Sequence, residues 1–384
     1  MTLEVASDSF KISIYWGDTM NQEVLGLTSA STATKVKVGI VTVYSGYNYG
    51  SVLQVFSLSR VVASLGYKGV IIDYLDLSQS HNRLMRLLTL KNRLFVCIKH
   101  PSVFRTVLNA RKKRIRTSSL VPTLLKDRFI EFHKKYLYLD KENYRKKASS
   151  YFAFICGSDQ IWHSNAPGLG EVNFLRFAER HKRIAYAPSL GSDTVPDYNR
   201  KRLAKYLREI PYLSVREQSG VKIIKELTGR DATLVLDPVL LAGKEFWEDN
   251  VKDIKKRNRK YMVCYFLSNS TRTLKIIDSI SKALDLEVIW INTGVSYEER
   301  DFLPLDASPL EFVSLFMNAS FACTDSFHGT AFSVMFGVPF YVFRRQYEVF
   351  SKQHTRIESF LSLMHLEDRL WNDNDETSFS HCDN

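Results

Sequence analysis

Short apolar segments rich in β-branched residues alternate along most of the chain with segments whose apolar residues recur every three or four positions. The short segments are nearly all apolar, which is typical of strands buried on both faces of a parallel sheet. Strands are predicted at residues 37–43, 70–74, 152–156, 183–187, 212–216, 233–236, 261–267, 287–291, 321–324 and 339–343. Helices are predicted at 51–65, 273–284, 310–317 and 328–336. This alternation predicts an α/β fold.

The pattern restarts after a charged stretch at residues 252–260, which predicts two domains. The length of 384 residues suits two domains of ordinary size. We expect two Rossmann-like, doubly wound domains facing a cleft, the first at 37–240 and the second at 241–384, which includes a C-terminal tail. Residues 1–36 are polar and mixed, without the apolar core of a signal peptide, and are expected to form a flexible leader.

A basic segment interrupts the first domain. Residues 81–147 hold 19 Lys and Arg against 4 Asp and Glu, whereas the whole chain has a net charge of +12. Apolar residues at helical spacing, such as Leu84, Leu87 and Leu88, predict a helical insert. A basic surface favours a polyanion, so one hypothesis is peripheral contact with an anionic membrane or with a phosphorylated lipid carrier. The alternative is a solvated helical face. No nucleic-acid-reading module is visible, so nucleic acid is not an expected partner.

Five scattered cysteines form no CxxC pair, which indicates a reducing compartment and argues against a thiolate metal site. No apolar run approaches the ~18 residues that a membrane-spanning helix needs. The expected location is therefore the cytoplasm. It includes the inner face of the membrane if the basic insert binds there.

Residues 324–330, with the sequence TDSFHGT, lie where a predicted strand meets a predicted helix. A helix N-terminus offers free backbone N–H groups that bind phosphate or carboxylate. Ser326 is a common N-cap residue, His328 adds an acid, a base or a positive charge, and Gly329 permits close approach of an anion. The alternative is that Asp325 and Ser326 only cap the helix while His328 packs.

Three further polar clusters follow predicted strands of the first domain. Arg216 ends a buried strand and has a fork geometry suited to carboxylate or phosphate, with a surface pair to Glu217 as the alternative. The loop at 157–162 has the sequence GSDQIW, in which Asp159 acts as a general base or caps the next segment. The first strand-to-helix turn carries Asn48, Gly50 and Gln54 and lacks the GxGxxG dinucleotide fingerprint. Clusters at strand ends in both domains predict one site in a cleft between them.

Together these motifs resemble the polysaccharide pyruvyl transferase family from about Lys37 to Arg369. The resemblance rests on NYGSVLQ at 48–54, GSDQIW at 157–162, YAPSLG at 186–191, SVRE at 214–217, LDP at 236–238 and DSFHGT at 325–330. It implies two Rossmann-like domains similar to the GT-B glycosyltransferases. Pro188 departs from the Ala or Ser that the family often has there.

The implied reaction transfers a pyruvyl group from phosphoenolpyruvate to a sugar of a cell-surface glycan or its lipid-linked precursor, forming a ketal. His328 would correspond to the family's donor-contacting histidine and Arg216 to its donor-binding arginine. Asp159 is our candidate for the base that acts on the sugar hydroxyl. The motifs place the remaining expected substrate-binding residues at Asn48, Gly50, Gln54, Ser158, Gln160, Ser189, Ser326, Gly329 and Thr330. Neither a metal nor a cofactor is expected on this scheme.

Two other functions stay open from the sequence. A GT-B-like nucleotide-sugar glycosyltransferase would share the architecture. A family member without catalysis would serve as a binding component of a glycan-synthesis complex. The presence of both His328 and Arg216 argues against the second of these.

Overall fold

The structure, a computed structural model, describes residues 36–75, 80–141, 143–268, 270–294, 304–345 and 355–372. The expected leader therefore lies outside the described residues except for Val36, and so does the end of the C-terminal tail. All the described residues belong to one compact unit, which begins at Val36.

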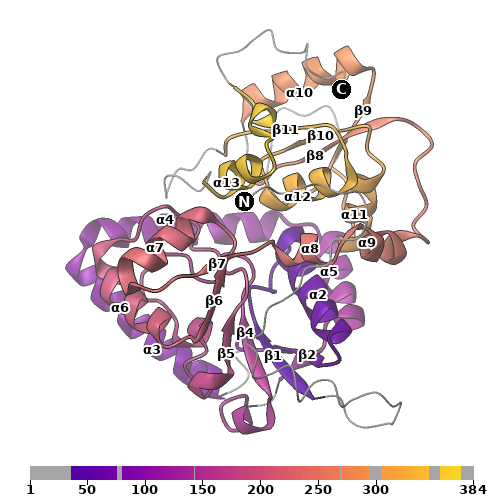
Figure 1. The fold of residues 1–384 in the computed structure, drawn as a ribbon. Coiled ribbons are helices and arrows are strands. Elements are labelled where there is room, and N and C mark those ends of the chain that lie inside the picture. The colour runs from indigo at the N-terminus through magenta and orange to yellow at the C-terminus, as the bar shows by residue number, and fades with distance from the viewer. Residues whose placement is uncertain are drawn as a thin grey trace. The chain divides into compact units, whose positions relative to one another are not determined.

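Residues 37–234 contribute a parallel sheet of seven strands, in the order β3-β2-β1-β4-β5-β6-β7 (Figure 1). The strands are β1 (Lys37–Val41), β2 (Lys68–Ile72), β3 (Leu139–Asp140), β4 (Ala153–Cys156), β5 (Arg183–Ala185), β6 (Tyr212–Val215) and β7 (Thr233–Leu234). From β1 the chain adds β2 and β3 on one side, and then adds β4 to β7 on the other side. The point at which the strand order reverses lies between β1 and β4, which pair in parallel through Gly39 and Phe154. Such a switch point is where open α/β sheets bind ligands.

A second parallel sheet of four strands has the order β11-β10-β8-β9. Its strands are β8 (Tyr261–Tyr265), β9 (Glu287–Trp290), β10 (Phe321–Thr324) and β11 (Phe340–Val342). Its switch point lies between β8 and β10, where Cys264 is the partner of Cys323. Two parallel sheets confirm the predicted α/β class with two Rossmann-like parts. The expected boundary at residues 240 and 241 stays a prediction.

Helices connect the strands, and they include the four helices that the apolar spacing predicted outside the basic insert. Those before β8 are α2 (Tyr49–Ser64), α3 (Ser80–Lys99), α4 (Pro101–Leu120), α5 (Thr123–Tyr136), α6 (Asp197–Arg208), α7 (Gln218–Thr228), α8 (Pro238–Leu241) and α9 (Lys244–Val251). Those after β8 are α10 (Thr271–Leu284), α11 (Pro309–Met317), α12 (Phe327–Phe336) and α13 (Thr355–Leu363). The basic insert contains α3, α4 and α5. It also contributes β3, an edge strand whose Leu139 pairs with Ile71 of β2.

One apolar core joins the two sheets. Its buried members come from β1, α2 and α5 and also from β8, α11 and α12. Tyr49 at the start of α2 stacks on Phe312 of α11, with ring centroids 4.6 Å apart, and its hydroxyl donates to the Ala307 carbonyl at 2.8 Å. This contact ties the N-terminus of α2 to the second sheet, so residues that begin α2 and α12 come close together.

Candidate active site

Four charged or ionisable side chains from both halves of the chain converge in one buried cluster: Asp159, Arg216, Asp237 and His328. We call them the central cluster. Asp159 follows β4 and His328 opens α12 after β10, so each lies at the switch point of its sheet. Arg216 follows β6, and Asp237 follows β7. Three of the four, Asp159, Arg216 and His328, were expected from the sequence as site residues.

Arg216 occupies the middle of this cluster. One guanidinium nitrogen, Nη1, donates to Oδ2 of Asp237, and the other, Nη2, lies 3.9 Å from Oδ1 of Asp159. The guanidinium lies over the ring of Phe327, 4.2 Å from its centroid. Within the described part of the chain, Nε and Nη2 are buried without a hydrogen-bond partner. A buried cation with unused donors is suited to bind an anion.

Asp237 is the cluster residue that the sequence analysis did not select. Its Oδ1 accepts from the backbone N–H of Val239 at 3.1 Å and caps α8, while its Oδ2 accepts from the hydroxyl of Ser158 at 2.8 Å. The same Oδ2 lies 3.8 Å from Nε2 of His328. The Leu-Asp-Pro motif was the available signal, since Pro at the first helical position marks Asp237 as an N-cap.

His328 is 5% exposed and packs directly on α2. A Cβ added to Gly50 would lie 2.0 Å from Nδ1 of His328, so the ring needs a glycine at that position. Burial holds the pKa of the His328 imidazole below its usual value, and Arg216 adds to this effect while Asp237 and Asp159 oppose it. The imidazole is therefore neutral near pH 7. Its Nε2 is buried without a hydrogen-bond partner among the described residues.

Asp159 has a left-handed backbone conformation, with φ of 58°. Its Oδ2 accepts a hydrogen bond of 2.6 Å from the Ser51 hydroxyl on α2. Burial by itself would raise the pKa of the Asp159 carboxyl, but His328 and Arg216 and the hydrogen bond from Ser51 hold it below its usual value. Asp159 is thus an ionised acceptor at neutral pH.

Three of the predicted binding residues position the Asp159 loop. The fully buried Gln54 amide donates to the Thr42 hydroxyl and to the Val43 carbonyl, both at 3.0 Å, and its oxygen accepts from the backbone N–H of Ser158. The Ser158 hydroxyl in turn holds Asp237. The N–H of Ser189 donates to the Asp159 carbonyl at 2.8 Å. These residues fix the backbone from which Asp159 projects.

Other predicted binding residues shape helix ends. Asn48 caps α2 by accepting from the N–H of Ser51 at 3.1 Å, and the Thr330 hydroxyl donates to the Ser326 carbonyl within α12. The Cβ that Gly329 lacks would lie 2.4 Å from the Thr324 hydroxyl, so Gly329 permits close packing of α12 on β10 where we expected close approach of an anion. Ser326 stands at the N-cap of α12 without a side-chain capping bond.

Two acidic residues within the predicted motifs have structural roles. Asp325 accepts from the N–H groups of Leu267 and Ser268, at 2.7 and 2.9 Å, and so ties the end of β8 to α12. Glu217 accepts from the N–H of Leu190 at 2.7 Å, so the alternative that Arg216 pairs with Glu217 at the surface is wrong. Arg216 is 8% exposed, and its carboxylate neighbours are Asp237 and Asp159.

Arg356 of α13 is a buried cation that the sequence analysis missed. Oriented so that its oxygen faces Arg356, the Gln160 amide accepts two hydrogen bonds from the guanidinium, at 3.2 and 2.7 Å. The positive charge of Arg356 contributes to lowering the pKa of both Asp159 and His328. It therefore acts on the central cluster from a helix that no motif marked.

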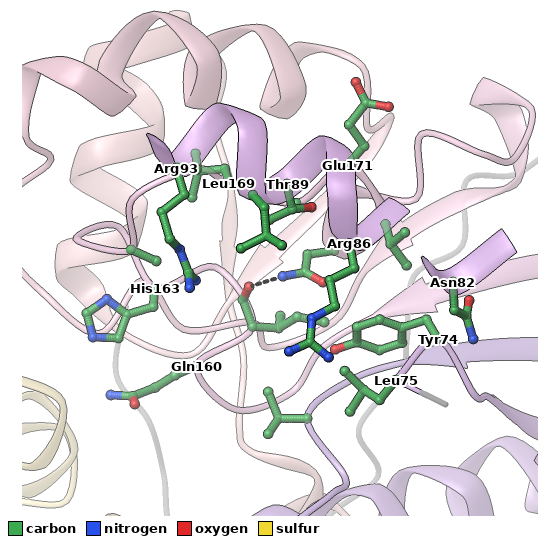
Figure 2. A pocket seen from close by; sticks show the side chains of 18 residues that line it. Tyr74, Leu75, Asn82, Arg86, Thr89, Arg93, Gln160, His163, Leu169 and Glu171 are labelled. Carbon is green, nitrogen blue, oxygen red and sulfur yellow. Dashed lines mark hydrogen bonds between the residues drawn. The ribbon is translucent and has the colours of Figure 1, made fainter. Parts of the chain in front are cut away.

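A cavity of about 530 Å³ lies under α3, next to the loop that carries Asp159. Gln160, which follows Asp159, and His163 form one side of it, and Arg86 and Arg93 of α3 form another. Figure 2 shows both arginine side chains pointing from α3 into the cavity, toward the side where Tyr74 and Gln160 lie. The lining combines charged, amide and apolar groups, a composition typical of sites for polar ligands.

The described residues show neither a cluster of metal ligands nor a membrane-spanning helix. None of their His, Cys, Asp and Glu side chains gather in threes or more as metal ligands would. None of their helices is both long and apolar enough to cross a bilayer.

A model of the polysaccharide pyruvyl transferase family matches residues 48–347, which is most of the chain. No curated protein matches the chain.

Solved structures resemble the chain at low identity. A UDP-GlcNAc 2-epimerase from Neisseria meningitidis has 11% identity and a TM-score of 0.42, with 87% of this chain and 92% of that chain covered. The E. coli heptosyltransferase WaaC has 10% identity and a TM-score of 0.35, with 86% and 99% covered. The glycosyltransferase SnogD from Streptomyces nogalater has 12% identity and a TM-score of 0.36, with 86% of each chain covered. At these TM-scores the likeness carries no further conclusion.

Proposed function

The chain belongs to the polysaccharide pyruvyl transferase family, and from this premise we propose that it transfers a pyruvyl group from phosphoenolpyruvate to two hydroxyls of a sugar. One observation carries the proposal. Arg216 and His328 present buried nitrogens without hydrogen-bond partners among the described residues, and both side chains lie next to Oδ2 of Asp237. Leaving such groups unpaired costs about 1–3 kcal/mol each, a cost that a bound anion removes.

Phosphoenolpyruvate carries a phosphate and a carboxylate, and the cluster offers a partner for each. The free donors of Arg216 suit a planar, bidentate contact with either group. The first N–H groups of α12 have no partner within the helix and favour negative charge. His328 is neutral in the free protein, and a phosphate beside it would raise its pKa, so donor binding would be accompanied by proton uptake.

The reaction we propose proceeds by addition and then displacement. A proton passes from His328 to the methylene carbon, which becomes a methyl group, while one sugar hydroxyl bonds to the central carbon and gives its proton to Asp159. A second sugar hydroxyl then bonds to the same carbon as phosphate leaves with the electron pair of the C–O bond and takes up the second hydroxyl proton. The products are a ketal and inorganic phosphate, and the protons balance once Asp159 gives up its proton and His328 regains one. Arg216 stabilises the charge on the departing phosphate.

The cavity under α3 is our proposed place for the acceptor, a sugar or a lipid-linked glycan. It adjoins Asp159 through Gln160, so a sugar bound there would present hydroxyls toward the proposed base. Arg86 and Arg93 would suit the phosphates of a lipid carrier. A cytoplasmic location, where phosphoenolpyruvate is made, belongs to the same proposal.

The test is incubation with phosphoenolpyruvate and a panel of free and lipid-linked sugars in D₂O. We expect phosphate release and a product whose methyl group holds one deuterium, detected by mass spectrometry. Arg216→Ala and His328→Ala should lose at least about a hundredfold in rate, as is typical when one stabilising donor or acid is removed. Arg200→Ala, which removes an exposed arginine paired with Glu226, is the control and should keep the wild-type rate.

Two results would contradict this function. Phosphate release that persists in Arg216→Ala would place the donor elsewhere. Binding of a nucleotide diphosphate sugar, together with absence of phosphoenolpyruvate binding, would support the glycosyltransferase alternative.

A further inference from the structure

The two faces of α3 have opposite surroundings. One face is fixed to the rest of the protein. The buried Asn82 amide donates to the Asp73 carbonyl at 2.9 Å, and a Cβ added to Gly168 would lie only 3.0 Å from the backbone nitrogen of Arg93, so Gly168 packs closely on the helix. Val96 and Cys97 are buried on the same side. The opposite face is therefore held outward by specific contacts.

That outward face is a stripe of large apolar side chains. Its members are Leu84, Leu87, Leu88, Leu94, Phe95 and Ile98, with exposed fractions of 57, 63, 47, 59, 56 and 77%. Their spacing of three and four residues places them along one side of the helix for four turns. We call them the α3 stripe. An exposed apolar surface of this kind marks an interaction site, since soluble proteins rarely display one without a partner.

The charge around the α3 stripe identifies the partner. Residues 80–120, which form α3 and α4, contain eleven Lys and Arg and no Asp or Glu. The basic side chains exposed there include Arg83, Lys91, Lys99, Arg105 and Lys112. Lys91 lies within the stripe itself, at the same helical spacing. An apolar stripe whose charged neighbours are all basic is typical of a helix that lies in the plane of an anionic bilayer.

A second copy of the chain is the other occupant that such a stripe could accept, and charge argues against it. Pairing two α3 helices would bring Lys91 and its basic neighbours together without any acidic residue of either helix to compensate. Like charges at that distance repel, whereas an anionic lipid surface attracts every one of them.

We propose that α3 docks the protein on an anionic membrane, with the α3 stripe inserted at the lipid headgroup boundary. The inner face of the same helix lines the cavity, through Arg86 and Arg93. Docking therefore brings the cavity within one helix diameter of the bilayer, which suits an acceptor that is anchored in lipid. The docking itself does not depend on the proposed function, because it rests on the outer face of α3 alone.

Co-sedimentation of the full chain with vesicles tests this proposal. We expect binding to vesicles that contain phosphatidylglycerol and little binding to phosphatidylcholine alone, with loss of binding in high salt. Transfer of one Leu-sized side chain into hydrocarbon is worth roughly tenfold in partitioning. Leu87→Gln/Ile98→Gln should thus bind at least about tenfold more weakly than the wild type.

The matched control is Leu65→Gln/Leu124→Gln, which removes two exposed leucines outside α3, 45 and 55% exposed, and should bind vesicles normally. Lys91→Gln/Lys99→Gln should weaken binding to the anionic vesicles about thirtyfold, since each basic residue near such a surface is worth roughly fivefold. All three variants change exposed side chains, and an unchanged melting temperature verifies that they fold.

Three results would overturn membrane docking. The first is equal binding to neutral and anionic vesicles, or no binding to either. The second is a stripe variant that binds as well as its control. The third is a change of oligomeric state in Leu87→Gln/Ile98→Gln, measured by sedimentation velocity without lipid, which would show that the stripe pairs with a second copy.

Discussion

Gly50→Ala is a one-carbon change that tests whether the N-terminus of α2 positions His328. The added methyl group would lie 2.0 Å from Nδ1 of His328 and 2.4 Å from Cγ, and ordinary contacts begin at 3.4 Å. The ring must therefore move by roughly 1 Å or more. Because Cγ is attached directly to the His328 Cβ, rotation of the ring alone does not relieve the clash.

The displacement should have a large effect on activity and a moderate effect on stability. A misplacement of about 1 Å in a catalytic group costs on the order of a hundredfold in rate. Overpacking of a buried contact costs about 1–3 kcal/mol of unfolding free energy. Alanine in a helix recovers up to about 1 kcal/mol relative to glycine, so the net destabilisation should be at the lower end of that range.

A double-mutant cycle isolates the contact. Phosphate release and urea unfolding are measured for wild type, Gly50→Ala, His328→Ala and the double variant. If Gly50 acts by making room for the ring, Gly50→Ala should cost nothing further once His328 is alanine. The stability arm of this cycle is independent of any assumption about the reaction.

Two outcomes would refute the reasoning. One is a Gly50→Ala protein with wild-type stability and a wild-type rate. The other is additivity in the cycle, which would mean that the methyl group disturbs α2 itself and not the imidazole.

Three further predictions concern charges in and around the central cluster. Asp237→Asn leaves Arg216 with one fewer buried carboxylate and should lower the free energy of unfolding by about 3–5 kcal/mol, measured in urea; a loss below about 1 kcal/mol would show that the pair is not coupled. Arg356→Ala removes a positive charge that lowers the pKa of His328. The pKa of His328 should therefore rise in an NMR titration, and an unchanged pKa would show that Arg356 lies too far from His328 to affect it. Burial lowers the pKa of His163 from 6.5 to about 4. Between these two pH values the His163 imidazole is therefore protonated in the unfolded protein and neutral in the folded protein. The free energy of unfolding should fall between pH 6.5 and about pH 4 by at most about 3 kcal/mol, and His163→Gln should remove that part of the acid sensitivity.

Local patterns in the sequence were enough to predict the elements and the edge at which the site lies. Apolar β-branched runs and helical spacing depend on neighbours in the chain, so they are readable without the fold. The carboxyl ends of parallel strands lie at the same edge of a sheet. Asp159 and Arg216 follow strands of the first sheet and His328 follows a strand of the second, so each was expected at the carboxyl edge of its sheet. The structure brings these side chains into one cluster, and their role in catalysis stays a prediction.

The tertiary structure decided which polar residues meet and which face of a helix is free. Asp237 looked like a helix cap, and it also contacts Arg216 because the end of β7 lies beside the end of β6. Arg356 had no local signal, since its contact with Gln160 joins segments almost two hundred residues apart.

Periodicity showed that α3 has an apolar side, but periodicity cannot tell whether that side faces the core or the solvent. The contacts of Asn82 and Gly168 settle this by fixing the other face to the protein. The sequence by itself thus determined the elements and the chemistry available at strand ends, because these follow from short-range spacing. Only the packing of distant segments decided partners, burial and charge balance, and these determine what each residue can do.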